Sequence, residues 1–598
     1  MTKKRWQKIA LIVMIFSLIS IDYNVNLGNS TLIKPFFGIT ILCPDTIPER
    51  IEWATLIAEK LPLIGINCEL VITNWSTISQ RSWGYPGPYP IPTHAEGGFD
   101  ILFIDWDWGL DIDFVGLFDT PSIPPNGDNL YQYSDPEMDW ALGNYSQSFN
   151  QTDRLFYANN VQQLLYDNLP AIAIINHQKL IVFNEDLEGS FDLLYHENFE
   201  PIENWEISGE TELHIAVPNR FDTFHILKYM KSNSDALWLK QIYPGLIMRD
   251  SETLGWTNRI ATSWNSDDGI TYNVQMNPNA VFADGHVLNT TDVNYTYNVL
   301  LDPFFGNWPW YFWWPPYYDE NPITILSEFE FQINFLQAWV FQDQNLNYGI
   351  LPKHIWESVQ PSDQINQSRD WALNDTLDSN LLGAGPYYLD DFDNTTSVIR
   401  LKRNEYFKNW TGITPNFEYL YFEYHPSKES AISSFETGYI DLIDPRFDIE
   451  YSDLENLTTA SSTLIDTCST QELAINMLHP YIGTGELCPI ASAESAKHIR
   501  KAISYIIPRR NIVQNITGDL SVPAATPWPR GSNGFNESLQ PLEYDLEKAW
   551  EHMKAAGNII EEQVGTTSSI GINFLVISST VVVSGVFASI MKKKEKRG

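Results

Sequence analysis

The sequence predicts an α/β fold with antiparallel insertions and a C-terminal transmembrane helix. Strand-like apolar runs alternate with amphipathic helix-like runs from residue 36 onward. Hydrophobic residues make up 43% of the 598 residues and aromatic residues 14%, which is sufficient for large buried cores. Near the C-terminus, a run of about 20 uncharged residues has the length that a membrane-spanning helix needs.

The first predicted elements form a β-α-β unit. Residues Phe36–Cys43 are mostly apolar and predict a buried strand, and Ile66–Thr73 predicts a second one. Between them, Ile51–Leu61 repeats apolar residues at helical spacing, which predicts a helix with one buried side. Strand, helix and strand in this order are typical of α/β proteins.

The same alternation continues along the chain. Further strands are predicted at Phe99–Ile104, Ala171–Ile175 and Glu212–Val217, and paired strands within Asp268–Phe282. Helices are predicted at Arg154–Tyr166, Thr223–Ile242 and Thr291–Leu301. The sequence contains no internal repeat and no low-complexity tract.

The charge balance argues against a nucleic-acid partner. Acidic residues number 75 and basic residues 37, for a formal net charge of -38. Nucleic-acid binding needs clustered basic residues, and these occur only at the two tips of the chain. The acidic excess predicts a well-solvated surface, with attraction of cationic ligands as the alternative.

Both ends of the chain carry signals for membrane targeting. The apolar run Ile9–Ile21 follows three basic residues, so residues 1–30 are expected to be a signal peptide or an N-terminal anchor. Residues 570–591 are expected to span the membrane, followed by the basic tail 592–598. Because positive residues stay cytoplasmic, residues from about 30 to 568 are expected outside the cell membrane.

Glycosylation sequons support an extracellular globular part. Asn-x-Ser/Thr occurs at Asn29, Asn74, Asn144, Asn150, Asn289, Asn294, Asn366, Asn374, Asn394, Asn409, Asn456, Asn515 and Asn536. Each sequon is weak evidence alone, but their density outside the C-terminal tail is typical of a glycosylated cell-surface protein. Together with the membrane signals, they favour an archaeal source.

The four cysteines leave two alternatives open. Outside the cell, Cys43 with Cys68 and Cys468 with Cys488 are candidate disulfides, and free buried thiols are the alternative. The sequence contains no Cys-x-x-Cys pair, which is the spacing that would predict a zinc site. The eleven histidines show no metal-binding spacing, so they are expected to be scattered, with no metal site and no cofactor. The sequence also lacks the catalytic motifs of hydrolases and nucleotide-binding enzymes.

A series of short motifs follows one order between residues 205 and 557. They are Glu212–Val217, Ser263–Tyr272, Ala280–Gly285, Thr291–Val293, Leu351–Ile355, Gly383–Tyr387, Arg403–Phe407, Gly438–Asp441, Ile475–Asn476, Ile499–Tyr505 and Tyr544–Ala549. Each motif is unspecific alone, but their shared order is specific. The segment resembles the dipeptide-, oligopeptide- and nickel-binding proteins of ABC importers, the family 5 extracellular solute-binding proteins.

The resemblance implies a circularly permuted chain. In the family, the last of these motifs precedes a further stretch that completes the fold, whereas this chain soon reaches the linker 558–569. Residues 31–200 resemble that missing stretch, and residues 201–557 resemble the N-terminal and central parts, which form both lobes. The alternative is that residues 32–200 are left over from a neighbouring module. Chain termini of compact domains often lie close together, which makes permutation physically reasonable.

The resemblance also implies architecture and function. Its fold is like that of periplasmic binding proteins: two α/β lobes joined by hinge strands, a smaller extra domain, and a ligand cleft between the lobes. Such proteins are not enzymes, and they deliver captured solutes to the permease and ATPase subunits of an ABC transporter. A peptide is the first expected ligand and an oligosaccharide the second. A non-transport surface sensor or adhesive protein on the same fold is the alternative.

Candidate ligand-binding residues follow the predicted strand Phe99–Ile104. In peptide-binding relatives an aspartate in this stretch pairs with the amino terminus of the peptide. Trp106 matches the family tryptophan, but the aspartate position falls on Gly109. Three neighbouring acids are candidates to replace it, with surface or turn-forming roles as the alternative. They are Asp105, Asp107 and Asp111.

Aromatic residues supply the other candidates. Trp75 matches an aromatic residue that lines the cleft in the family. Trp310 and Trp313 belong to a cluster of aromatic residues and prolines at 308–318, where prolines disfavour a regular helix. Aromatic faces bind peptide side chains or sugars, although a packing loop between domains is the alternative.

Overall fold

The computed structural model describes residues 34–195, 201–228, 234–306, 318–374, 380–455, 457 and 459–559. The described chain as far as Asn558 belongs to one compact unit. Within this part of the chain, no helix combines the length and the apolar character needed to cross a membrane. The expected N-terminal signal or anchor and the expected membrane-spanning segment 570–591 lie outside the described residues.

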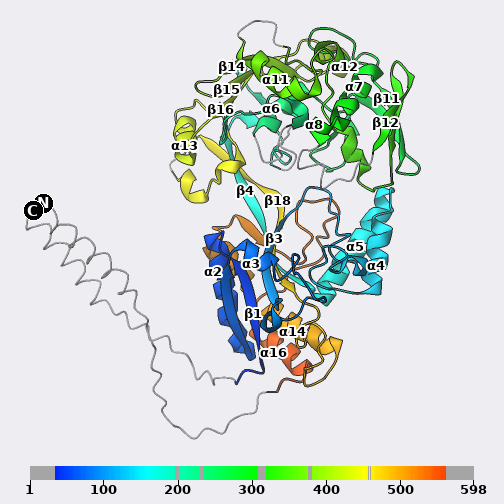
Figure 1. Ribbon diagram of the computed structural model, residues 1–598. Helices are drawn as coiled ribbons and strands as arrows, with labels where there is room; N and C mark the ends of the chain where they lie inside the picture. The colour runs from blue at the N-terminus through cyan, green and yellow to red at the C-terminus, as the bar shows by residue number, and fades with distance from the viewer. Residues whose placement is uncertain are drawn as a thin grey trace, which may run out of the picture. The chain divides into compact units, whose positions relative to one another are not determined.

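One sheet of eleven strands organises the described chain (Figure 1). Its order is β14-β15-β16-β7-β17-β4-β18-β3-β1-β2, with β19 beside β4. The strands are β1 (Phe37–Pro44), β2 (Ile66–Thr73), β3 (Ile101–Asp107), β4 (Ala171–Asn184), β7 (Glu212–Val217), β14 (Tyr387–Asp393), β15 (Val398–Arg403), β16 (Tyr419–Tyr424), β17 (Leu442–Ile443), β18 (Ala460–Ile475) and β19 (Ser521–Pro523). The pairs β1–β2, β1–β3, β16–β7 and β17–β7 are parallel, as the α/β prediction requires.

Strands β4 and β18 run through both halves of the sheet. The first residues of β4, Ala171–Ile175, pair with Gln471–Ala474 of β18, which pairs with β3 on its other side. The later residues of β4, Gln178–Asn184, pair with Ala460–Asp466 of β18. There β17 lies on the other side of β4. The two strands therefore connect two groups of strands that are otherwise built from different parts of the chain.

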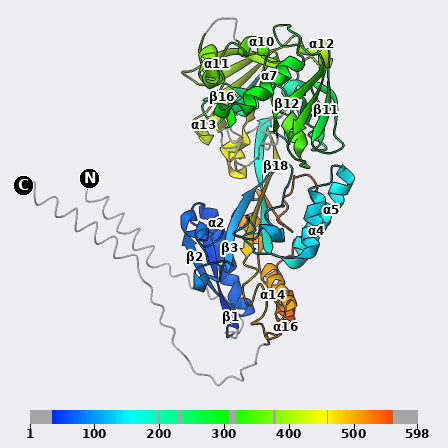
Figure 2. The same cartoon turned by 45° about the vertical axis from the view of Figure 1, so that its right-hand side comes forward.

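We name these groups the terminal lobe and the central lobe. The terminal lobe contains residues 34–175 and 468–558, and the central lobe contains the described residues of 180–465. In Figures 1 and 2, the blue and orange segments of the terminal lobe lie together, although they come from opposite ends of the chain. One lobe thus unites the two ends, while the other is continuous in sequence.

The pairing of β4 with β18 is interrupted between the lobes. The register shifts between Asp466 and Thr470. Within this interval, Cys468 has a φ of 51°, in the left-handed region that β-strand residues rarely adopt. The Thr467 hydroxyl donates a hydrogen bond to the His177 carbonyl across the gap, at 2.9 Å. Irregularities of this kind bend a strand, so β18 bends at the boundary between the lobes.

Helices cover both faces of the terminal-lobe strands. The helices of this lobe are α2 (Pro48–Lys60), α3 (Trp75–Ser79), α4 (Pro136–Tyr145), α5 (Gln151–Asn168), α14 (Ala493–Tyr505), α15 (Arg509–Asn515) and α16 (Leu546–Ala555). In β1, Ile39 and Ile41 face a core shared with α2, α14 and α16, whereas Leu42 faces a core shared with α4 and α5. Alternation of strand side chains produces these two cores. Figures 1 and 2 show α2 and α5 on opposite sides of the strands.

The two ends of the described chain meet in the terminal lobe. Phe36 precedes β1, Trp550 lies in α16, and their ring centroids are 6.2 Å apart in an edge-to-face contact. Ile66 of β2 and Met553 of α16 belong to the same fully buried core. Residues from both ends are therefore required to complete one hydrophobic core.

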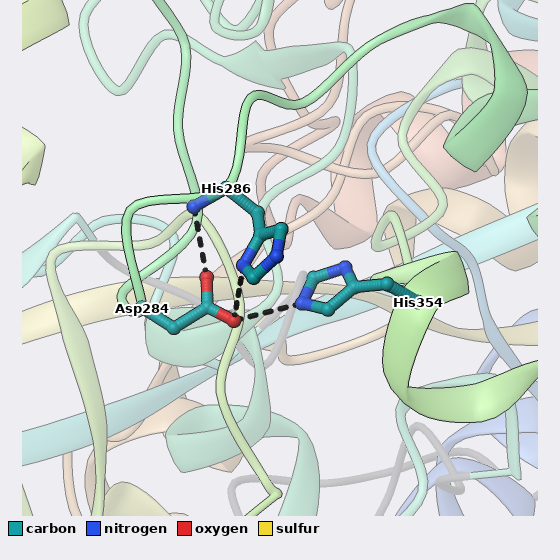
Figure 3. A group of neighbouring side chains, drawn as sticks. All are labelled: Asp284, His286 and His354. Atoms are coloured by element: carbon teal, nitrogen blue, oxygen red, sulfur yellow. Dashed lines mark hydrogen bonds and ion pairs between the residues drawn. The ribbon is translucent and has the colours of Figure 1, made fainter.

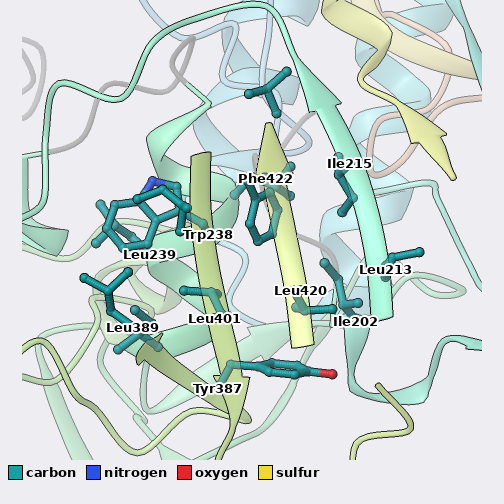
Figure 4. Packing of buried hydrophobic residues seen from close by; sticks show 14 of the residues in the cluster. Ile202, Leu213, Ile215, Trp238, Leu239, Tyr387, Leu389, Leu401, Leu420 and Phe422 are labelled. Atoms are coloured by element: carbon teal, nitrogen blue, oxygen red, sulfur yellow. The ribbon is translucent and has the colours of Figure 1, made fainter. Parts of the chain in front are cut away.

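The central lobe buries the opposite half of the sheet against its own helices. These helices are α6 (Asp235–Ile242), α10 (Lys353–Trp356), α11 (Gln364–Leu373) and α13 (Lys428–Glu436). Alternate residues of β7, Leu213 and Ile215, share one core with Leu420 and Phe422 of β16 (Figure 4). Ala216 faces the opposite core with α13.

An extra antiparallel sheet is inserted in the central lobe. Its strands, in spatial order, are β10 (Ala261–Asn265), β11 (Thr271–Met276), β13 (Glu330–Phe335) and β12 (Tyr318–Ser327). Three further helices accompany it: α7 (Thr290–Leu301), α8 (Pro303–Gly306) and α12 (Phe407–Thr411). Val274, Ile333 and Val293 belong to a core of its own, as expected for the smaller extra domain. Two short pairs complete the strands: β5 (Leu187–Glu188) with β6 (Glu206–Ile207), and β8 (Ile247–Arg249) with β9 (Trp256–Asn258).

Some predicted elements have the expected limits in the structure, and others differ. The strands Ile66–Thr73 and Glu212–Val217 are confirmed residue for residue. Of the predicted helix Thr223–Ile242, residues 223–225 are not helical, Ile226–Lys228 form a 3-10 turn, and α6 begins at Asp235, whose carboxylate accepts the Thr223 N–H; residues 229–233 lie outside the described residues. The predicted strand Ala171–Ile175 continues to Asn184, since polar residues are accommodated where β4 passes between the lobes.

The structure contradicts both candidate disulfides, because all four cysteines are free. Parallel register places Cys68 opposite Ile39 rather than Cys43, four residues away along β1. Four strand residues span about 13 Å, well beyond the roughly 7 Å limit between the Cα atoms of a disulfide. Cys468 and Cys488 lie in two different hydrophobic cores. Burial raises the pKa of Cys43 to about 11 and that of Cys68 to about 12, so both thiols stay protonated.

Candidate ligand-binding site

The predicted acidic and aromatic run lies where β3 reaches the boundary between the lobes. Buried apolar residues form the first part of β3, and Asp105, Trp106 and Asp107 end it. Because strand side chains alternate, Asp105 and Asp107 point to one face of the sheet and Trp106 to the other. Carboxyl ends of parallel strands are where open α/β sheets bind ligands.

Asp105 is held by an arginine that the sequence analysis missed. Arg50, in the first turn of α2, places Nη2 2.6 Å from Asp105 Oδ1, and its side chain is only 1% exposed. The Arg50 guanidinium also lies over the Trp75 indole, 5.8 Å from the ring centroid. Trp75 begins α3, where the Asn74 side chain accepts the Thr77 N–H as a helix cap. Arg50 therefore joins two of the predicted binding residues.

Trp106 belongs to a buried polar cluster on the opposite face. Its Nε1 donates to Glu472 Oε1 and lies equally close to the Tyr131 hydroxyl, both at 3.2 Å. Tyr131 in turn donates a short hydrogen bond to Glu472. Burial raises the pKa of Glu472 to about 7, although these two hydrogen bonds oppose the shift. The indole of Trp106 is thus fixed by a carboxyl group in strand β18.

Asp107 lies near Tyr195 of the central lobe. It is exposed at the end of β3. Burial, followed by the negative charge of Asp107, raises the pKa of Tyr195 to about 12. The Arg446 guanidinium lies 5.8 Å from the Tyr195 ring centroid and makes two hydrogen bonds to Asp444, at 2.8 and 3.1 Å. Among the described residues, Arg446 Nη2 is buried and has no hydrogen-bond partner. Tyr195 of the central lobe therefore lies near both Asp107 of the terminal lobe and Arg446 of its own lobe.

Asp111 is occupied by protein groups from the central lobe and the terminal lobe. It forms a short ion pair with Arg249 of β8, and both side chains are at most 5% exposed. Gln344 Nε2 donates to Asp111 at 3.0 Å, and Asn533 Nδ2 donates at 2.7 Å. With three protein donors around it, Asp111 connects the lobes.

An apolar contact accompanies this connection. Leu110 and Cys468 of the terminal lobe form a small cluster with Leu193 of the central lobe. Phe341 of the central lobe is buried in the terminal-lobe core. The predicted residues Trp310 and Trp313 lie outside the described residues.

The residues that surround the candidate site and that the sequence does not predict come from remote elements. Glu472 and Tyr131 are 341 residues apart in the chain, and Trp106 and Glu472 are 366 residues apart. Neither Arg50 nor Arg446 belongs to a motif of its own. One sequence signal could have pointed to Glu472. The short family motif Ile475–Asn476 begins three residues after it, at the end of β18.

Known proteins share this sequence pattern. A family model described as bacterial extracellular solute-binding proteins, family 5 middle, matches residues 255–590. Heme-binding protein A of Haemophilus influenzae is 21% identical over 340 residues, covering 53% of this chain and 57% of that protein. The peptide transport periplasmic protein SapA of Salmonella typhimurium is 23% identical over 332 residues, covering 53% of this chain and 56% of that protein. The chain therefore spans little more than half the length of these curated relatives.

Solved structures of similar proteins are also known. The oligopeptide-binding protein AppA of Bacillus subtilis, in complex with a nonapeptide, has 19% identity and a TM-score of 0.38. That match covers 58% of this chain and 64% of the AppA chain. The family match extends over more than half of the present chain and confirms the family that the motif series predicts. The chain belongs to the bacterial extracellular solute-binding proteins of family 5.

Proposed function

We propose that this protein captures a peptide between its terminal and central lobes and delivers it to the permease and ATPase subunits of an ABC transporter. Two charged groups carry the proposal: the exposed carboxylate of Asp107 in one lobe, and the Arg446 guanidinium beside Tyr195 in the other. A peptide has a free ammonium group and a free carboxylate. An aspartate and a guanidinium match these two ends by charge-assisted hydrogen bonds. The proposed role is binding and release, without a chemical step.

The hinge strands supply the proposed motion. Contacts in both lobes stabilise a closed form, so a ligand shifts the population toward closure. Strands β4 and β18 pass between the lobes, and β18 bends near Cys468. Residues at such a bend absorb the change in backbone angles during closure.

The other predicted binding residues divide into two groups. Trp75 and Trp106 offer indole surfaces for ligand side chains at the edge of the terminal lobe, and Trp310 and Trp313 are proposed to add further stacking surfaces. In contrast, Asp105 holds Arg50 and Asp111 holds Arg249. We therefore assign these two acids to shaping the site rather than to contacting the peptide.

Peptides with free termini are expected to raise the melting temperature of the full-length protein. A ligand at 100 times its dissociation constant adds about 2.7 kcal/mol to the free energy of unfolding. Replacement of Asp107 by asparagine removes one charge-assisted hydrogen bond, worth about 1.5–3 kcal/mol, and should weaken peptide binding roughly ten- to hundredfold. Thermal-shift screening followed by calorimetric titration measures both effects.

The matched controls use a blocked ligand and a remote carboxylate. The N-acetylated form of the same peptide should bind wild type and Asp107→Asn equally, because it lacks the ammonium group. Glu547→Gln removes an exposed carboxylate on α16 and should leave binding unchanged. If oligosaccharides raise the melting temperature and no peptide does, the proposed ligand class is wrong.

We also propose that the globular part is held at the outer face of the cell membrane by residues 570–591, with the basic tail 592–598 inside. The uncharged length of this segment and the charges after it support this orientation. The full chain is expected to remain with the membrane fraction after carbonate extraction. A chain that ends at residue 569, expressed with the same N-terminus, should be released. Retention of the shortened chain would assign the tether to residues 1–30 instead.

Circular permutation is proposed as the origin of the unusual segment order. The proximity of Phe36 to Trp550 supports it, because a short connection can join the two ends of the terminal lobe. A rearranged globular part that starts near residue 201, continues to 557, and is linked to residues 34–195 should fold with a similar melting temperature. Segments 34–195 and 201–557 can also be expressed separately. If each unfolds cooperatively by itself and the two do not associate, the proposal is contradicted.

A further inference from the structure

Two histidines and one aspartate from separate parts of the chain meet beside the core of the extra sheet (Figure 3). Asp284 and His286 lie in the turn between Phe282 and Leu288, and both of those apolar residues are buried in that core. His354 is 70 residues from Asp284 and lies in the short helix α10. Although the sequence spacing predicts scattered histidines, folding brings His286 and His354 together.

The side chains converge on one carboxylate oxygen. His286 Nδ1 is 2.9 Å and His354 Nε2 is 2.7 Å from Asp284 Oδ2. The two imidazole rings stack with centroids 4.0 Å apart and planes inclined by 23°. Both imidazoles therefore direct a ring nitrogen at the same carboxylate oxygen.

The backbone holds the turn in place. Gly285 has a φ of 89°, a left-handed conformation that a β-carbon disfavours. The Gly285 N–H donates to the Phe282 carbonyl, and the Phe282 N–H donates to the His286 carbonyl, both at 2.9 Å. The His286 N–H also donates to Asp284 Oδ1 at 3.0 Å, which leaves Oδ2 directed at the imidazoles.

Helix α10 is anchored as firmly as the turn. The Lys353 N–H donates to the Asp292 carboxylate at 2.9 Å, and the Trp356 side chain is fully buried. His354 therefore approaches the turn from a fixed support, while its imidazole remains accessible to solvent. Binding of an ion at this point would link two segments that are far apart in sequence.

We propose that Asp284, His286 and His354 form a binding site for a divalent transition-metal ion of the nickel, copper and zinc class. Two imidazole nitrogens and one carboxylate oxygen are ligands that these ions prefer. Bond lengths of about 2.0–2.1 Å place neighbouring ligand atoms roughly 3.3 Å apart in a tetrahedral site. The present separations of 2.7 and 2.9 Å need to open by only about half an ångström to reach this spacing. Because all three residues are exposed, water can complete the coordination.

A second pair of histidines provides a comparison within the same chain. His498 Nδ1 and His552 Nδ1 are 2.8 Å apart, where α14 packs against α16. The nearby carboxylate of Glu494 faces the other nitrogen of His498, at 3.8 Å from Nε2. Two imidazoles and a carboxylate therefore do not converge at that position, which makes this pair a matched control.

Equilibrium dialysis of the full-length protein with Ni²⁺ tests the site. The protein should carry no histidine tag and be freed of metal with a chelator. Wild type is expected to bind one ion, with His286→Gln, His354→Gln and Asp284→Asn each weakening binding roughly tenfold or more. With Cu²⁺, electron paramagnetic resonance should show two coordinating imidazole nitrogens in wild type and one in either histidine variant.

The control is the double variant His498→Gln/His552→Gln, which should bind Ni²⁺ as wild type does. The metal-free melting temperatures should be alike for all variants, because the altered side chains are exposed or partly exposed. Absence of saturable binding would overturn the proposal. The proposal would also be overturned if the affinity for Ni²⁺ is unchanged by all three substitutions in the site. Loss of Ni²⁺ binding in the His498→Gln/His552→Gln control would overturn it as well.

Discussion

Replacement of Asp111 by alanine is expected to lower the free energy of unfolding by about 3–5 kcal/mol, because it removes the carboxylate that forms an ion pair with the buried Arg249 guanidinium. Arg249 is only 3% exposed and lies in the central lobe, whereas Asp111 follows β3 in the terminal lobe. The substitution also removes the acceptor for Gln344 and Asn533. Urea unfolding of the full-length protein, followed by circular dichroism, measures the loss.

A double-mutant cycle separates the ion pair from the loss of packing. Asp111→Leu with Arg249→Met removes both charges and should recover most of the stability, since an apolar pair of similar volume avoids the desolvation cost. Arg510→Met is the control, because the Arg510–Glu543 pair is 72% and 52% exposed and is screened by solvent, so its loss should change the stability little. Equal losses for Asp111→Ala and Arg510→Met would show that the interlobe pair is solvated in solution.

Glu472 is expected to make the protein less stable as the pH rises from about 4.5 to 7. Its folded pKa is about 7, against an ordinary value of 4.5, because the group is completely buried. Between these values the folded protein retains a proton that the unfolded chain has lost. The free energy of unfolding therefore decreases with rising pH, by about 3 kcal/mol in total, and the contribution is constant above pH 7.

Comparison of wild type with Glu472→Gln isolates this contribution. The glutamine cannot titrate, and its amide oxygen preserves an acceptor for Tyr131 and Trp106. The variant should therefore lack the Glu472 part of the pH slope, while other buried groups still contribute. For example, burial lowers the pKa of His177 to about 4, which destabilises the folded state below about pH 6.5. Parallel stability curves for wild type and variant between pH 4.5 and 7 would contradict the assignment.

Local sequence patterns were sufficient for much of the secondary structure. The strand Ile66–Thr73 was predicted with its observed limits, because a β-branched, apolar run bounded by turn residues is a local property. The hinge strand β18 was not predicted as a strand. Its segment Ala460–Ile475 contains nine polar or charged residues, and the strands that pair with it are β4, almost 300 residues away, and β3, which is further still.

The candidate binding site illustrates the same division. Asp105, Trp106 and Asp107 were identified because they follow an apolar strand and match part of a family pattern. Their different environments depend on the two faces of β3 and on partners from elsewhere in the fold. Arg50 takes up Asp105 on one face, and Glu472 fixes Trp106 on the other.

The sequence by itself determined the α/β class, the family and the approximate strands and helices, since periodicity and motif order are properties of consecutive residues. Tertiary structure alone decided that the four cysteines are free, that Asp111 joins the lobes, and that His286 meets His354 at Asp284. Each of these outcomes depends on strand register or on chain segments that meet only after folding. Side-chain environment is set by such neighbours, and sequence spacing does not contain them.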